Sequence, residues 1–130
     1  MDEYFREDER LFRAVRPGPM YWKDACTVSS AAFKTKEEDG LSTDRDGGRT
    51  VEECVKRLSD NLSGGVVSVD CSQCREADVM VKYAPVEYNE FHTLLRRNEE
   101  NAELTKSQAR ALAKLCRIDK LSEETAETNL

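Results

Sequence analysis

Apolar residues recur at helical spacing in two segments of the chain. The first segment, 50–62, opens with Thr50 and Glu53, whose spacing is that of a capping box. Its apolar face comprises Val51, Cys54, Val55, Leu58 and Leu62. The second segment, 105–118, opens with the same kind of pair, Thr105 and Gln108, and its apolar stripe comprises Ala109, Leu112, Ala113 and Cys116, with Leu115 alongside. We expect an amphipathic helix over about Thr50 to Leu62 and another over about Thr105 to Ile118.

Short apolar runs rich in β-branched residues predict strands between and before these helices. The runs are 11–15, which ends at Pro17-Gly18-Pro19, then 66–69, and 79–83, which ends at Pro85. The segment 72–78 is long enough for one helical turn. The sequence does not decide between a helix and a strand for the segment 88–95. The spacing of Tyr88, Phe91 and Leu95 suits a helix, whereas the run 91–95 suits a strand.

These elements predict an α+β fold, with a small, mostly antiparallel sheet and the two amphipathic helices packed on one face. Residues 1–118 form the expected single domain. Residues 119–130 are acidic and poor in apolar side chains, and we expect them to form a flexible tail.

Composition narrows the classes of function. A chain of 130 residues can bury a core without disulfides or a metal. Its net charge of −6 disfavours nucleic acids and anionic membranes as partners, and no apolar run approaches the roughly 20 residues that span a bilayer. The N-terminal residues lack a secretory apolar core. The odd number of cysteines favours free thiols in a reducing cytoplasm; they are Cys26, Cys54, Cys71, Cys74 and Cys116.

The segment 28–48 is the best pointer to a site, because it is long, polar and without a clean period. Arg13 interrupts a strand, where it either faces solvent or holds a phosphate or carboxylate through its planar guanidinium. Ser29 and Ser30 could add hydroxyl donors, with Ser42 and Arg45 closing the other side of an anion-binding cleft. The run Asp44-Arg45-Asp46-Gly47-Gly48 also has the composition of a tight turn before a helix.

His92, the only histidine, is the candidate catalytic residue, since imidazole can act as a general base near neutral pH. A structural role for it stays open. Cys71 and Cys74 could form a redox pair or half a zinc site, but no second pair is present at zinc-ligand spacing, and two ordinary thiols are the favoured interpretation. We therefore predict no metal and no cofactor.

Two resemblances add expectations. The segments LFRAV, SSAAFK and GLSTDR, with a histidine after Pro85, resemble small bacterial proteins to which no activity is attached. The order of Arg13 followed by Ser29-Ser30 is similar to the arginine and serine motifs that bind NAD in ADP-ribosyltransferases. In this chain the gap between the two motifs is short, and no glutamate stands in a matching late motif.

The expected function is a small binding or regulatory protein of a bacterial cytoplasm, acting on a protein partner or a small anionic ligand. The alternative is a small enzyme of nucleotide or NAD-linked chemistry, similar to an ADP-ribosyltransferase, that uses Arg13, Ser30 and His92. Convergence of the candidate residues in one pocket would favour a ligand or a substrate, whereas an exposed apolar patch would favour a protein partner.

Overall fold

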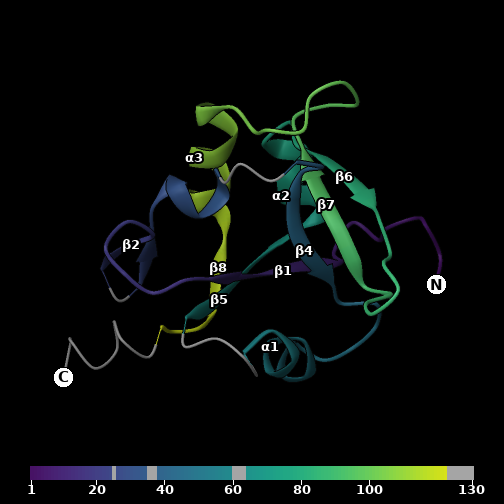
Figure 1. The fold of residues 1–130 in the computed structure, drawn as a ribbon, viewed down its shortest axis with the longest axis horizontal. Coiled ribbons are helices and arrows are strands. Elements are labelled where there is room, and N and C mark those ends of the chain that lie inside the picture. The colour runs from purple at the N-terminus through teal and green to yellow at the C-terminus, as the bar shows by residue number, and fades with distance from the viewer. Residues whose placement is uncertain (25, 35–37, 60–63, 123–130) are drawn as a thin grey trace.

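A computed structural model describes residues 1–24, 26–34, 38–59 and 64–122 of the chain. Within these residues the main element is a six-stranded sheet of order β6-β7-β4-β1-β5-β8 (Figure 1). All of its pairings are antiparallel. The strands are β1 (Arg10–Val15), β4 (Leu41–Arg45), β5 (Gly65–Asp70), β6 (Met80–Tyr83), β7 (His92–Arg96) and β8 (Arg117–Lys120). A separate pair, β2 (Trp22–Asp24) and β3 (Thr27–Val28), forms a small ribbon beside it.

The two amphipathic helices begin where their capping patterns predict. The described helices are α1 (Val51–Ser59), α2 (Cys71–Glu76) and α3 (Lys106–Leu115), with a 3₁₀ turn η1 (Ser30–Phe33). Before α1, the Glu53 amide donates to Thr50 Oγ1 at 3.2 Å, and the Thr50 amide donates back to the Glu53 carboxylate at 3.3 Å. Before α3, Thr105 and Gln108 make the same reciprocal pair at 3.1 and 2.9 Å. Both capping boxes are confirmed.

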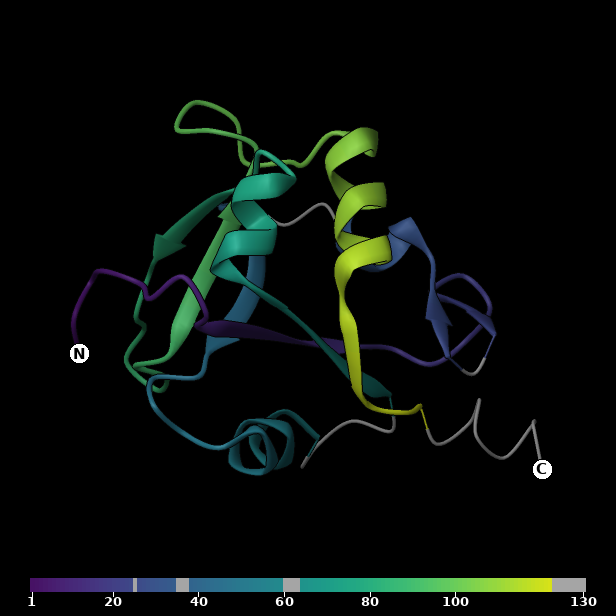
Figure 2. The same cartoon turned by 180° about the vertical axis from the view of Figure 1, so that it is seen from behind.

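The two amphipathic helices cover opposite faces of the sheet, which corrects the expectation that they share one. Leu11 and Phe12 are neighbours in β1 and both are fully buried, so their side chains fill the two faces. Leu11 belongs to the main core together with Leu112 of α3, whereas Phe12 packs with Cys54 of α1. In Figure 2, β1 runs between α1 and α3. An apolar helix face shows that a helix packs, but not which side of a sheet it covers.

The strands predicted over 11–15, 66–69 and 79–83 are confirmed as β1, β5 and β6. The open segment 88–95 contains β7, and the helical turn expected over 72–78 is α2. The second long helix ends earlier than expected, because Cys116 is already extended and residues 117–120 pair with β5 as an edge strand. Asp119 and Lys120, assigned above to the tail, are thus part of β8.

Some expectations lie outside the described residues. They concern Leu62, the last member of the first apolar face, residues 35–37 of the long polar segment, and residues 123–130 of the tail. Among the described residues, no helix is long and apolar enough to cross a membrane.

Candidate functional site

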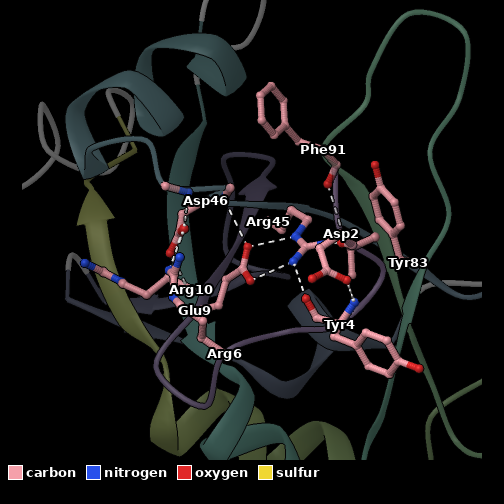
Figure 3. Close-up of polar contacts among 12 residues, drawn as sticks. Asp2, Tyr4, Arg6, Glu9, Arg10, Arg45, Asp46, Tyr83 and Phe91 are labelled. Carbon is pink, nitrogen blue, oxygen red and sulfur yellow. Dashed lines mark hydrogen bonds and ion pairs between the residues drawn. The ribbon is translucent and has the colours of Figure 1, made fainter.

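Arg45 is part of a buried ion pair and not of an open cleft (Figure 3). Its Nε and Nη2 donate to the two carboxylate oxygens of Glu9, each at 2.8 Å, and both side chains are at most 4% exposed. The guanidinium also donates to the backbone carbonyls of Asp2 and Tyr4. Hydrogen bonding to Glu9 raises the pKa of Arg45, against the opposing effect of burial. Arg45 therefore ties the N-terminal segment to β4.

The run that follows Arg45 forms the turn into α1 that its composition predicts. Asp46 accepts hydrogen bonds from the amides of Arg10 and Gly48 and from the guanidinium of Arg6, at 2.8–2.9 Å. Burial alone would raise the pKa of Asp46, but these donors outweigh it and the pKa is lowered. Gly47 and Gly48 both have positive φ, as such a turn requires.

Arg13 is half-buried and lines a cavity of about 200 Å³ together with Ser42 and Thr43, but its guanidinium is bonded to the backbone. Its Nε donates to the carbonyl of Ala32 at 2.8 Å, and its Nη1 donates to the carbonyl of Ser42 at 2.9 Å. The β1–β4 register ends at the pair Phe12 and Asp44. Beyond this pair, the Arg13 guanidinium connects the two strands through its hydrogen bond to the Ser42 carbonyl. Arg13 thus joins β1 to both η1 and β4.

The structure brings Ser42 and His92 together. His92 Nε2 lies 3.1 Å from Ser42 Oγ, and His92 Nδ1 lies 2.8 Å from the carbonyl oxygen of Ala84. In the β4–β7 register Ser42 faces Leu94 and Asp44 faces His92, which makes Ser42 and His92 diagonal neighbours on one sheet face. The pairing of β4 with β7 brings the two residues together, although they lie 50 positions apart in the chain.

Ser42 and His92 both line a cavity of about 330 Å³, which we call the serine pocket. Its remaining lining is Glu38, Asp39, Gly40, Ala84, Pro85, Val86 and Leu94. Gly40 has a φ of +131°, and a Cβ there would meet the backbone oxygen of Leu95 at 3.0 Å. A glycine at this point lets the loop before β4 pass close to β7 at the pocket wall.

Ser29 and Ser30 lie elsewhere. Ser29 Oγ donates to the carbonyl of Met20 at 2.6 Å. Ser30 lines a larger cavity, of about 560 Å³, between the β2–β3 ribbon, α3 and β8. We call this cavity the basic pocket; its other lining residues are Lys23, Cys26, Thr27, Val28, Arg110, Ala113, Lys114, Cys116 and Ile118.

The basic pocket gathers three cationic side chains that no motif in the sequence singles out. Lys23, Arg110 and Lys114 are exposed, and no hydrogen bond or ion pair joins any of them to another described residue. No carboxylate is among the pocket's lining residues within the described chain. One feature of the sequence could have indicated this cluster. Arg110 and Lys114 are four residues apart, next to the apolar stripe of the second predicted helix.

Cys71 and Cys74 are core thiols, 8% and 0% exposed. Burial raises the pKa of Cys71 to about 12 and also raises that of Cys74. Thiols in such surroundings stay protonated and unreactive at neutral pH, which supports the interpretation of two ordinary thiols. None of the five cysteines is in a disulfide. In the described part of the chain, no three histidine, cysteine or acidic side chains are grouped so that they could hold a metal ion.

No protein-family model, no curated protein and no solved structure matches the chain. Function is therefore inferred from the geometry of the two pockets.

Proposed function

We propose that the protein binds a small organic anion, carrying a phosphate or carboxylate group, in the basic pocket. The observation that carries this proposal is the gathering of Lys23, Arg110 and Lys114 around one cavity, with no partner among the described residues. Their positions contrast with the chain as a whole, which has a net charge of −6. An acidic protein that collects unpaired cations at one cavity has a local potential suited to an anion.

The arrangement on α3 carries an energetic cost that a bound anion would relieve. Arg110 and Lys114 are four residues apart on the same side of the helix, and like charges at this spacing destabilise a helix by about 0.2–0.5 kcal/mol. An anion about 4 Å from one cation gains about 1 kcal/mol in water and about 4 kcal/mol at an effective dielectric constant of about 20. Binding would therefore replace a repulsion with two attractions.

The remaining lining fits an organic ligand better than a bare ion. Thr27 and Ser30 offer hydroxyl groups that can donate to phosphate or carboxylate oxygens. Val28, Ala113 and Ile118 give the same cavity apolar surface. A volume of about 560 Å³ is within the range of pockets that hold small molecules.

The two other expected functions have less support. Arg13, Ser30 and His92, the residues of the NAD-linked alternative, each line a different cavity. The large apolar side chains exposed in the described residues come from five stretches of the chain rather than from one; they are Met1, Tyr4, Met20, Val51, Val86, Tyr88 and Leu121.

The proposal is tested by a thermal-shift screen against inorganic phosphate, AMP, NAD, glucose 6-phosphate and citrate, with calorimetry on the hits. A ligand at about 100 times its Kd stabilises the folded chain by about 2.7 kcal/mol, which raises the Tm by several degrees. We expect the double substitution Arg110→Gln with Lys114→Gln to abolish the shift.

Lys106→Gln is the matched control, because it removes a positive charge from the same helix outside the basic pocket. It should leave the shift intact. The proposal is wrong if none of the five compounds shifts the Tm, or if the double variant responds as the native chain does.

A further inference from the structure

The serine pocket is independent of the basic pocket and contains a different chemistry. We propose that Ser42 and His92 form a nucleophile and general-base pair that accepts an acyl group from small esters. The two atoms that must exchange a proton, Ser42 Oγ and His92 Nε2, are already 3.1 Å apart. This lies within the distance expected between an activated serine and its base.

The orientation of the imidazole ring supports this role. A carbonyl oxygen can only accept a hydrogen bond, so Nδ1, at 2.8 Å from the Ala84 carbonyl, carries the proton in the neutral ring. Nε2 then presents its lone pair to the Ser42 hydroxyl. The Ala84 carbonyl occupies the place that a carboxylate takes in a Ser-His-Asp triad, where the third group fixes the ring and its tautomer.

Ser42 is held in place through its backbone. Its carbonyl accepts a hydrogen bond from Arg13 at 2.9 Å, and its strand pairs with β7 on the other side. A nucleophile on a strand with bonded neighbours is positioned more rigidly than one on a loop. Arg13 is in this respect a positioning residue.

The lining of the serine pocket selects the substrate class. Pro85, Val86 and Leu94 provide apolar surface for an acyl chain, and the volume of about 330 Å³ limits the substrate to a small molecule. Glu38 and Asp39 at the same cavity repel anions. The expected substrates are esters of short apolar acids with a neutral or positively charged alcohol.

The reaction balances without a cofactor. Ser42 Oγ attacks the ester carbonyl carbon while its proton passes to His92 Nε2. The bond from the carbonyl carbon to the alcohol oxygen breaks, and the alcohol leaves with the proton from Nε2. In the second half, His92 Nε2 takes a proton from water while the water oxygen attacks the acyl carbon. The bond from that carbon to Ser42 Oγ breaks, the proton returns from Nε2 to Oγ, and the acid is released.

Turnover should be slow, because a carbonyl dipole stabilises the protonated imidazole less than a carboxylate would. The sharper assay is therefore a single covalent capture. With an alkyl fluorophosphonate, Ser42 Oγ bonds to phosphorus, the P–F bond breaks and fluoride leaves, and the Ser42 proton passes to His92. We expect intact-mass spectrometry of the full chain to show one adduct and peptide mapping to place it on Ser42.

Variants separate catalysis from a merely structural hydrogen bond. Ser42→Ala should abolish labelling, and His92→Gln should slow it by about 100-fold or more, with circular dichroism confirming that both remain folded. Ser29→Ala, which alters a serine outside the pocket, should label at the native rate. p-Nitrophenyl acetate provides a second probe, with an initial burst of nitrophenol that Ser42→Ala should remove, His92→Gln should slow and Ser29→Ala should retain.

The inference is overturned if neither probe modifies the native chain, if the adduct lies on another residue, or if His92→Gln labels as fast as the native protein. The outcome does not depend on the basic pocket, so this proposal and the proposed function can fail separately.

Discussion

Replacing Arg45 by alanine should be among the most destabilising single changes in the chain. The substitution leaves the Glu9 carboxylate, whose side chain is 2% exposed, without its charged partner. It also releases the backbone carbonyls of Asp2 and Tyr4. The guanidinium further lies over the ring of Phe5, at 4.0 Å from its centroid, so a cation–π contact is lost as well.

The expected loss is about 3–5 kcal/mol, the usual cost of removing one partner of a buried ion pair. A domain of this size is stable by about 5–15 kcal/mol in total, so Arg45→Ala should unfold at markedly lower denaturant or temperature. The double change Glu9→Leu with Arg45→Met removes both charges and keeps much of the volume. It should cost less than Arg45→Ala, because no buried charge is left unpaired.

The assay is equilibrium urea unfolding, followed by circular dichroism and by the fluorescence of Trp22, which is buried and the only tryptophan. Arg75→Ala is the control, because its ion pair with Glu7 is solvated, with side chains 71% and 60% exposed, and should contribute less than about 1 kcal/mol. A loss for Arg45→Ala no larger than that for Arg75→Ala would refute the reasoning. So would a double variant less stable than Arg45→Ala.

The remaining predictions concern pH, thiol access and strand anchoring. Asp46 has a lowered pKa in the folded state, so its stabilising effect is present above the unfolded value of about 3.9 and is lost as the pH falls through the folded value. Asp46→Asn should thus cost about 1–3 kcal/mol at neutral pH and progressively less below about pH 4, as measured by urea unfolding across pH. In native protein, Ellman's reagent should react first with Cys26, the exposed thiol, and hardly with Cys71, whose pKa burial raises to about 12; loss of the fast phase in Cys26→Ser checks this, and its persistence would contradict the assignment. Arg13→Ala should destabilise the fold by about 2–4 kcal/mol, because two part-buried carbonyls lose a charged donor, and a thermal melt indistinguishable from the native one would rule out the anchoring role.

Local patterns were sufficient for most of the fold. Thr50 and Thr105 begin their helices because a capping box is a contact between residues three positions apart, which a sequence displays directly. The error at the end of α3 has an equally physical origin. Cys116 and Ile118 are apolar and extend the apolar stripe of the predicted helix. In the structure, however, residues 117–120 pair with β5 and form a strand.

The candidate site was harder to predict, because side-chain type does not show what a charge is paired with. Arg45 and Arg13 both looked available for a ligand. In the structure, Arg45 is paired with Glu9, and Arg13 donates to two backbone carbonyls. These partners are far from the two arginines along the chain, so a local sequence pattern does not reveal them. Lys23 and Lys114, by contrast, belong to no sequence motif, and both line one cavity.

The sequence by itself determined the α+β class, the two capped helices, three of the strands and the turn before α1, since each depends on neighbouring residues and on the period of apolar positions. Tertiary structure alone decided that α1 and α3 cover opposite faces, that Ser42 meets His92, and that three cations share the basic pocket. Those features depend on strand order and register, which bring together residues far apart along the chain. The chemistry of individual residues identifies candidate site residues, and the pairing of strands determines which of these candidates lie together.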